Sequence, residues 1–190
     1  LGADAAAGPH RSTRAARRRD RLARRPMNDI GFALRSELRI ERERLISAFS
    51  AGGRVEPLLR GFTRCVDRTL ARLARSQGLA RRVAIVAVGG DGRGELFPPS
   101  DVDVLLVIPE DASADELASI ERLIGMLWDL GLQVGHSVRT AAQCRDDAAA
   151  DVTVLTSMIE SRCIAGPNAL FESFVKNVSE AIDPQNFFRE

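Results

Sequence analysis

The sequence predicts an α+β protein with a small mixed sheet, flanking helices and a pair of helices before the sheet. Residues 83–88 and 102–108 are continuous apolar runs, which are typical of strands covered on both faces. Residues 28–49 and 57–77 instead repeat apolar side chains at helical intervals. The chain of 190 residues suffices for one core with appendages, but not for several catalytic domains.

The chain divides into four predicted segments. Residues 1–26 are rich in Ala and Arg without helical periodicity, so we expect a disordered leader. Met27 is interpreted as the natural start, with a targeting peptide or basic tail as the alternative for the leader. Residues 27–80 hold the paired helices, and residues 81–165 form the core. Residues 166–190 are expected to be the helical start of a following region that this chain lacks.

The paired helices are predicted from their apolar positions and from glycines at their ends. Gly52-Gly53 ends the first helix, and Gly78 stands where a C-terminal glycine belongs in the second. The predicted buried side chains of the first helix are Ile30, Phe32, Leu34, Leu38, Leu45, Ile46 and Phe49. Those of the second are Leu58, Leu59, Phe62, Val66, Leu70 and Leu73.

The middle of the core contains a helix followed by a strand. A capping box at Ser113 and Glu116 predicts a helix over residues 113–130. Its predicted buried side chains are Leu117, Ile120, Leu123, Ile124, Leu127 and Trp128. Residues 132–138 alternate as a third strand, which places on one face the side chains of Leu132, Val134, His136 and Val138.

Helices are predicted for the remainder of the chain. A short helix is expected after Thr140, and another from residue 152 to about residue 163, with Asp151 as a possible cap. Gly166-Pro167 interrupts the pattern, and a last helix is expected over residues 169–182.

Composition and charge exclude several classes of protein. Residues 1–26 contribute a charge of about +6 and leave about −5 for the rest, which argues against a nucleic-acid-binding surface. No apolar run reaches the roughly 18 residues of a membrane span. Cys65, Cys144 and Cys163 are widely spaced and are interpreted as free thiols. We therefore expect a cytoplasmic protein without nucleic-acid or membrane partners.

The candidate metal ligands are Asp101 and Asp103, at the start of the second apolar run. Alternate strand residues share a face, so these carboxylates lie roughly 6.5 Å apart along the strand. They repel each other by about 3 kcal/mol at an effective dielectric constant near 20, and a divalent cation reverses that sign. Mg²⁺ takes such oxygen ligands and completes its shell with water and substrate phosphates. The pair therefore predicts a site for Mg²⁺ and a triphosphate.

The turn before this pair is rich in glycine and is the candidate phosphate-binding segment. Gly89 and Gly90 leave backbone N–H groups accessible to anionic oxygens. Arg93 stands between two further glycines and is a candidate phosphate ligand, with a surface salt bridge as the equal alternative. Ser100, next to the aspartate pair, is a fourth candidate nucleotide-binding residue.

The glycine turn and the aspartate pair together resemble nucleotidyltransferases related to DNA polymerase beta. In that pattern an apolar residue and two glycines precede an Asp-apolar-Asp-apolar run, which here starts eleven residues after Gly90. A dinucleotide-binding fingerprint is disfavoured, because Pro98-Pro99 forbids the long helix that it requires. A nucleotide-sugar glycosyltransferase also uses Asp-x-Asp, but it does not need the glycine turn.

Further blocks make the resemblance more specific. They are Trp128-Asp129-Leu130-Gly131-Leu132, Gly135-His136-Ser137-Val138-Arg139-Thr140, Asp151-Val152-Thr153 and Glu160-Ser161-Arg162. With the central stretch they closely resemble the N-terminal nucleotidyltransferase domain of the bifunctional uridylyltransferase/uridylyl-removing enzymes. The resemblance covers roughly residues 30–185. Asp91 departs from it, because many relatives carry an aromatic residue there, and the difference could alter base or phosphate contacts.

The resemblance implies Mg²⁺-dependent transfer of UMP from UTP to a tyrosine hydroxyl of the PII nitrogen-signalling protein, with pyrophosphate as the leaving group. In the family the removing activity belongs to a following phosphohydrolase domain with His and Asp ligands, and glutamine sensing to C-terminal ACT domains. This chain has only His10 and His136, so neither property is expected of it alone. The alternatives are a catalytically inactive regulatory nucleotide-binding module, or a nucleotidyltransferase with another acceptor or nucleotide.

The residue that activates the acceptor is left open by the sequence. The superfamily usually has a third carboxylate on a neighbouring strand, and the third strand here offers no Asp or Glu. Asp151 is the candidate catalytic carboxylate, although its position fits a helix N-cap equally well. His136 and Arg139 are possible acceptor-side residues, with His136 as a base or else a hydrogen-bonded core residue.

Overall fold

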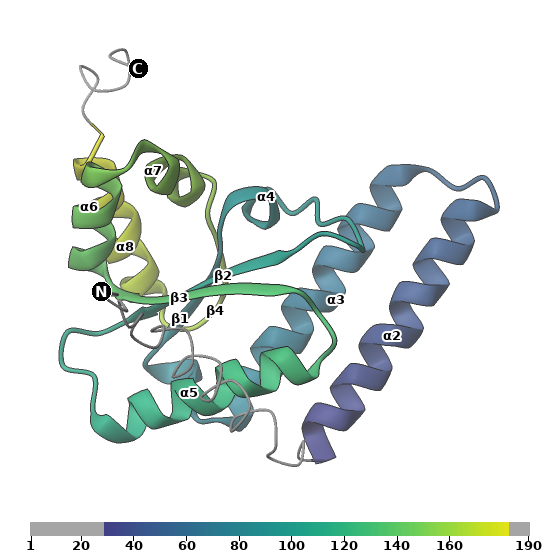
Figure 1. Ribbon diagram of the computed structural model, residues 1–190, viewed down its shortest axis with the longest axis horizontal. Helices are drawn as coiled ribbons and strands as arrows, with labels where there is room; N and C mark the ends of the chain where they lie inside the picture. Colours follow the sequence, from purple (N-terminus) through teal and green to yellow (C-terminus); the bar gives the residue numbers. More distant parts are fainter. Residues whose placement is uncertain (1–28, 183–190) are drawn as a thin grey trace, which may run out of the picture.

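The computed structural model describes residues 29–182; the predicted leader, Met27 and residues 183–190 lie outside that range. In chain order, and as labelled in Figure 1, the elements are α2 (Asp29–Ser50), α3 (Val55–Ser76), the 3₁₀ turn η1 (Leu79–Arg81), β1 (Ala84–Ala87), α4 (Gly89–Gly92), β2 (Val102–Ile108), α5 (Ala114–Asp129), β3 (Val134–Thr140), α6 (Ala141–Ala150), α7 (Val152–Ile159), β4 (Arg162–Ala165) and α8 (Asn168–Glu180). The predicted α+β class is confirmed.

The four strands form a mixed sheet in the order β3-β2-β1-β4. β1 pairs antiparallel with β2 and with β4, whereas β2 and β3 run parallel. A parallel pair needs a crossover, and α5 supplies it between β2 and β3. In the parallel register Asp103 lies opposite Gly135, and Val104 lies opposite His136. This register determines which side chains of β3 share a face of the sheet with Asp103.

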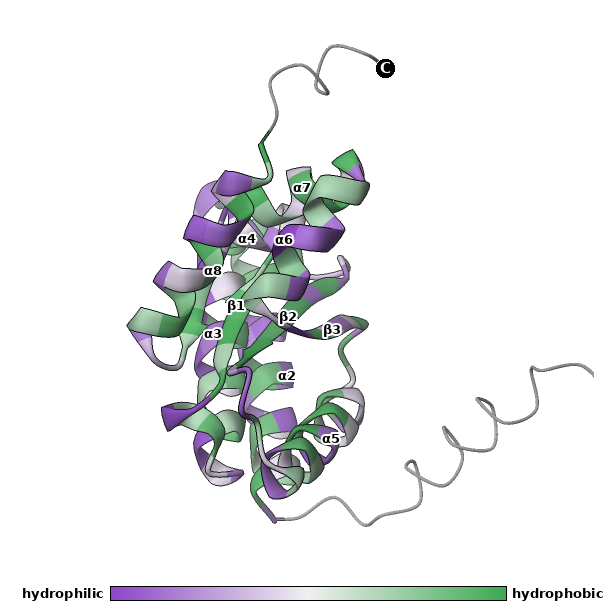
Figure 2. Ribbon diagram, turned by 90° about the vertical axis from the view of Figure 1, so that its left-hand side faces the viewer, coloured by the Kyte–Doolittle hydropathy of each residue, from purple (hydrophilic) through white to green (hydrophobic). Residues whose placement is uncertain are grey.

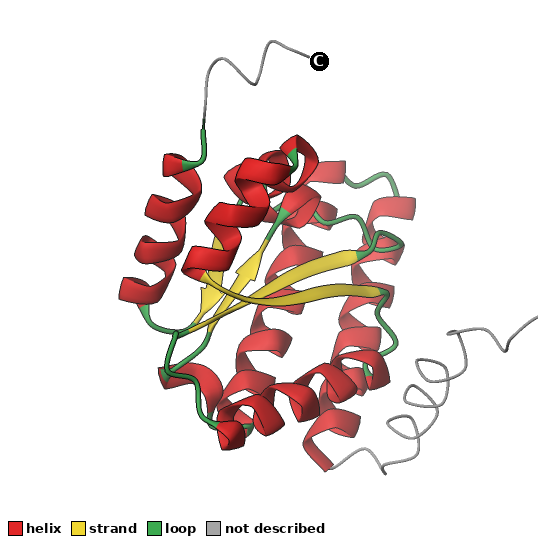
Figure 3. Cartoon of the chain, turned by 60° about the vertical axis from the view of Figure 1, so that its left-hand side comes forward, coloured by secondary structure: helices red, strands yellow, loops and turns green. Residues whose placement is uncertain are grey.

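Helices cover both faces of the sheet and form two cores, as Figure 3 shows. The first core lies between the sheet and α2, α3 and α5, and includes Leu34, Phe62, Ile85, Leu106 and Leu123. The second core lies between the sheet and α6, α7 and α8, and includes Val86, Leu105, Cys144, Leu155 and Phe174. Figure 2 shows β1 as hydrophobic throughout, as expected of a strand covered on both sides.

Alternation along β2 assigns its side chains to the two cores. Val102, Val104 and Leu106 belong to the first core, and Leu105 and Val107 to the second. Because alternate residues share a face, the predicted metal ligands at positions 101 and 103 lie on the face of the second core. That face therefore carries the candidate chemistry.

One predicted helix is too long at its C-terminal end. α7 ends at Ile159, and Arg162–Ala165 form the edge strand β4 instead of the helical continuation to residue 163. The sequence pattern missed this strand because it has four residues and no alternation. Pairing with β1, in which Arg162 lies opposite Ala87, overrides the local helical preference.

The predicted buried face is confirmed for α3, apart from the half-buried Leu59, but is partly wrong for α2 and α5. In α2 the fully buried positions are Leu34, Leu38 and Leu45, whereas Phe32, Ile46 and Phe49 are exposed. In α5, Leu117 and Trp128 are exposed. Each of these helices contacts the rest of the fold through a stripe narrower than its apolar pattern suggests.

Several local predictions are confirmed. Ser113 and Glu116 form the capping box of α5. The strand predicted over residues 132–138 is observed two residues later, at Val134–Thr140. Of its predicted face, Leu132, Val134 and Val138 pack on the first core, whereas His136 is exposed. The three cysteines are free. No helix among residues 29–182 is both long and apolar enough to cross a membrane.

The last helix packs onto the same sheet as the rest of the fold. α8 contributes the buried side chains of Phe174 and Val178 to the second core. The division of the chain at residue 166 stays a prediction.

Candidate active site

The glycine turn follows β1 directly and folds into the single helical turn α4. Gly89 adopts φ of +59°, a left-handed conformation that glycine tolerates better than other residues. The first N–H groups of a helical turn have no partner within that turn. Gly89 and Gly90 therefore have backbone N–H groups without a partner in α4, and their binding of phosphate oxygens stays a prediction.

Asp101 and Asp103 stand at the start of β2, and both are exposed. A Cβ atom built on Gly89 would lie 3.9 Å from Oδ2 of Asp103, so the carboxylate and the glycine turn are adjacent. Neither aspartate forms an ion pair with another residue in the described range 29–182. Both carboxylates are therefore available to an external ligand.

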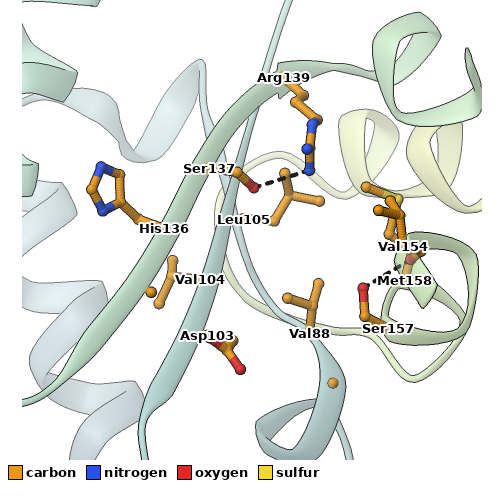
Figure 4. Close-up of a pocket in the computed structure, with 12 residues that line it drawn as sticks. Val88, Asp103, Val104, Leu105, His136, Ser137, Arg139, Val154, Ser157 and Met158 are labelled. Carbon is orange, nitrogen blue, oxygen red and sulfur yellow. Dashed lines mark hydrogen bonds between the residues drawn. The ribbon is translucent and has the colours of Figure 1, made fainter. Parts of the chain in front are cut away.

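A hollow of about 280 Å³ opens beside Asp103, between the sheet and α7. Figure 4 shows its lining, which combines Gly89 and Asp103 with Ser137 and Arg139 of β3 and with Ser157 of α7. The hollow thus connects the carboxylate and the glycine turn to polar side chains of β3. Ser100, Asp101, Gly90 and Arg93 are not among the lining residues.

Arg139 lies on the same side of the sheet as Asp103. It is opposite Val107 in the register, so it shares the face of Asp103, although it is four residues further along the strand. Its Nε forms an ion pair of 2.6 Å with Asp147 of α6, and its Nη1 donates to Ser137 Oγ at 3.3 Å. These partners hold the guanidinium, and Figure 4 shows it in the hollow with its hydrogen bond to Ser137.

His136 lies on the opposite side of the sheet from Arg139. Its register partner Val104 belongs to the first core, and Figure 4 shows the imidazole pointing away from Ser137 and Arg139. The ring packs edge-on against Trp128 of α5, with the ring centroids 5.7 Å apart. Burial lowers the pKa of His136. The structure does not bring this imidazole to the carboxylate of Asp103.

The residue of β3 that lies opposite Asp103 is a glycine. Gly135 lies opposite Asp103, and a Cβ atom built on it would lie only 2.4 Å from Asp103 Oδ1. Any side chain at position 135 would therefore displace the carboxylate. This close approach explains why β3 carries no acidic residue beside Asp103.

Asp151 caps α7. Its Oδ1 accepts hydrogen bonds from the backbone N–H groups of Thr153 at 2.7 Å and Val154 at 3.4 Å. These bonds lower the pKa of Asp151. Asp151 does not line the hollow, so the structure does not bring its carboxylate beside Asp103.

Arg93 and Ser100 lie at the exposed edge of the site. Arg93 forms an ion pair with Glu160 at the end of α7, which is the surface salt bridge that the sequence left as an alternative. The backbone N–H of Ser100 donates to the carbonyl of Phe97 at 2.8 Å and closes the turn before Asp101.

The sequence analysis named Arg162 only within the Glu160-Ser161-Arg162 block, without a role at the glycine turn, and did not identify Asp67. Asp67 of α3 and Arg162 of β4 form an ion pair that also reaches Asp91, whose carboxylate faces the protein interior. For Asp67 the available signal in the sequence was its position as an acidic residue among the arginines of α3.

The donor set fits Mg²⁺ bound together with a nucleotide. Asp101 and Asp103 offer hard oxygen ligands without competing ion pairs, and Mg²⁺ is usually held by one or two carboxylates plus phosphates. Within residues 29–182 no group of three or more His, Cys, Asp or Glu side chains could hold a metal ion. The remaining ligands would have to come from substrate and water.

Comparison with known proteins agrees with this geometry. The family model described as "Putative nucleotidyltransferase DUF294" matches residues 41–153. The chain is 47% identical over 156 residues to a bifunctional uridylyltransferase/uridylyl-removing enzyme of Burkholderia pseudomallei, and 48% identical over the same length to one of Burkholderia thailandensis. Each match covers 82% of this chain and 18% of the relative, so the chain spans about a fifth of the length of these relatives.

Proposed function

Because the chain belongs to this nucleotidyltransferase family, we propose that it transfers UMP from UTP to a tyrosine hydroxyl of a PII signalling protein and releases pyrophosphate. The observation that carries the proposal is the exposed Asp103 carboxylate beside Gly89, at the mouth of the hollow. The uridylyl-removing activity in the relatives' name is not part of the proposal.

The substrate triphosphate would lie along the glycine turn. The backbone donors of Gly89 and Gly90 would bind phosphate oxygens, and Ser100 would contribute a hydroxyl. Arg93 is a surface side chain whose partner Glu160 is itself exposed, so phosphate could replace that partner. Asp101 and Asp103 would hold Mg²⁺, which when bound neutralises charge that develops on the phosphates.

The reaction requires one bond to form and one to break at the α-phosphorus. The acceptor oxygen attacks in line, the bond to the bridging oxygen of the β-phosphate breaks, and pyrophosphate leaves with that electron pair, while the hydroxyl proton is released to solvent. Placing the acceptor hydroxyl in line is the main task of the protein. The hydroxyl would enter from β3, where Arg139 and Ser137 line the hollow.

Acceptor positioning is the role proposed for Arg139. Its guanidinium is fixed by Asp147 and faces the hollow, so it can donate to an oxygen of the acceptor or of the α-phosphate. The side chain of His136 lies on the other face, and Asp151 is engaged at the start of α7. Neither is assigned a proton-transfer role in the proposal.

The test is label transfer. The protein is incubated with Mg²⁺, UTP labelled at the α-phosphate and a bacterial PII protein, and label on PII is measured. We expect transfer by the unmodified chain, and a loss of about a hundredfold to a thousandfold with Asp103→Asn. Asp115→Asn, an exposed aspartate of α5, is the matched control and should keep full activity.

Two outcomes would contradict the proposal. If nucleotide binds but no label reaches PII, the chain is a regulatory nucleotide-binding module instead of an enzyme. If Asp103→Asn transfers label as fast as the unmodified chain, the metal role is wrong. Competition by unlabelled ATP and CTP then measures nucleotide choice, and we expect UTP to compete best.

A further inference from the structure

The glycine turn is supported from outside its own motif. A Cβ atom built on Gly92 would lie 1.5 Å from the carbonyl oxygen of Glu160, so the turn packs directly on the segment between α7 and β4. On the other side, the backbone N–H of Leu96 donates to Thr63 Oγ1 of α3 at 2.9 Å. The turn is therefore held between α3 and the start of β4.

Arg162 connects these supports. Its Nη1 and Nη2 donate to the two carboxylate oxygens of Asp67 at 2.6 and 3.2 Å. The same Nη2 donates to the backbone carbonyl of Asp91 at 3.2 Å. A fork of two parallel hydrogen bonds fixes the plane of a guanidinium, so Asp67 sets the direction in which Arg162 meets the turn.

The buried carboxylate of Asp91 means that loss of its contact with Arg162 would destabilise the turn. Its carboxylate is completely buried and has no hydrogen-bond partner among the described residues, although Oδ1 lies 3.5 Å from Arg162 Nη2. Burial raises the pKa of Asp91 to about 6, and the positive charge of Arg162 opposes that rise. A buried carboxylate without a compensating charge is strongly destabilising, so the turn depends on Arg162 for its conformation.

We propose that Arg162 is a positioning residue for the phosphate-binding turn. Held by Asp67, it fixes the backbone at Asp91 and thereby the direction of the N–H groups of Gly89 and Gly90. Arg162 would not contact the nucleotide itself, because its guanidinium faces α3. The expected effect of Arg162 on the kinetics of UMP transfer rests on the proposed function. Its expected effect on the conformation of the turn does not.

The conformational effect is tested without nucleotide by hydrogen–deuterium exchange. Arg162→Lys keeps the positive charge but cannot reproduce the fork to Asp67 together with the bond to the Asp91 carbonyl. We expect amides of residues 88–96 to exchange at least about tenfold faster in this variant, with α5 unchanged. Asp67→Asn should produce the same local change, because it releases the guanidinium from α3.

The kinetic effect is tested by measuring KM and kcat for UMP transfer separately in Arg162→Lys and Asp67→Asn. Loss of turn positioning should raise the KM for UTP about tenfold and change kcat by less than about threefold. A merely structural role would reduce the active fraction, which lowers kcat and leaves KM unchanged. Arg82→Lys is the matched control, since Arg82 also bridges two acidic residues, Asp111 and Glu116, but at the other end of β1.

The outcomes separate the two proposals. Faster exchange over residues 88–96 and a raised KM, with neither effect in Arg82→Lys, support the positioning role. Unchanged exchange and unchanged KM in both Arg162→Lys and Asp67→Asn overturn it, even if UMP transfer is observed. Faster exchange in a chain that transfers no UMP supports the structural role of Arg162 and refutes the proposed function instead.

Discussion

The two faces of the sheet have different tasks although the same strands build both. The face towards α2, α3 and α5 is covered by a continuous aliphatic core. The face towards α6, α7 and α8 has a smaller core, and at one end it opens into the hollow beside Asp103. The candidate site thus lies at one end of the face with the smaller core, where the hollow adjoins the start of β2.

Strand alternation, more than sequence distance, decides which residues can act together. His136 and Arg139 are three residues apart on β3 and both border the hollow, yet the imidazole of His136 points away and packs on Trp128, whereas the guanidinium of Arg139 faces the hollow. Asp103 shares a face with Arg139, and Gly135 leaves room for the carboxylate. Substitutions on the two faces should therefore separate activity from stability.

Among variants that keep both candidate metal ligands, the largest effect is expected from Gly135→Ala. The added Cβ would lie 2.4 Å from Asp103 Oδ1, so the carboxylate must move. A misplacement of about 1 Å in a reacting group can cost about a hundredfold in rate, and we expect a loss of that size in UMP transfer. The free energy of unfolding should change little, because position 135 is exposed.

Gly125→Ala is the matched control on the other face. A Cβ atom at this position in the middle of α5 would meet nothing within 4 Å. Alanine is favoured over glycine in a helix interior by up to about 1 kcal/mol, so chemical denaturation should show equal or greater stability with full activity. Equal loss of activity in both variants would contradict the assignment of the reacting face.

A smaller effect is expected from the pair on β3. Arg139→Gln removes a charged donor from the hollow and should slow UMP transfer about tenfold, the size of one charge-assisted hydrogen bond. His136→Phe keeps an aromatic ring against Trp128 and should change the rate by less than about twofold. Steady-state kinetics of both variants would show which face of the sheet takes part in the reaction. A larger loss of rate in His136→Phe than in Arg139→Gln would refute the assignment of the reaction to the face of Asp103.

The smallest effect concerns Asp151. Asp151→Ala removes the cap of α7 and should cost about 1 kcal/mol of stability. Asp151→Asn can still cap the helix, and we expect it to keep UMP transfer within about threefold. A large loss of activity with unchanged stability in the Asn variant would identify Asp151 as the third carboxylate.

The pKa of Asp151 gives the same substitution a pH signature. Because the folded pKa lies below the ordinary value of 3.8, the ionised side chain stabilises the fold above that pH. This contribution is lost as the pH falls through the lowered pKa. Asp151→Asn should therefore flatten the decline of stability in this acid range, as measured by denaturation at a series of pH values.

The sequence predicted most elements because their patterns are local. Residues 102–108 were placed correctly as a strand, and the capping box at Ser113 located the start of α5. β4 was missed because its pairing with β1 is a long-range effect in a segment of four residues. Which apolar side chains of α2 are exposed depends on how many other elements pack against this helix. The periodicity of the helix itself gives no information on that number.

The candidate site was predictable where the motif is contiguous. Gly89, Asp101 and Asp103 were identified from spacing and chemistry, and their roles stay predictions. The face on which His136 lies needed the register of β2 and β3, and the contact between Arg162 and Asp67 joins positions 95 residues apart. Such contacts have no local signature in a single sequence.

The activity proposed for the face of Asp103 is transfer of a nucleoside monophosphate. It is tested most directly by incubating the chain with Mg²⁺, a PII protein and UTP labelled at either the α- or the γ-phosphate. Attack at the α-phosphorus predicts that PII acquires the α-label, while the γ-label leaves in pyrophosphate. Transfer of the γ-label to PII, or no label on PII from either UTP, would contradict the account.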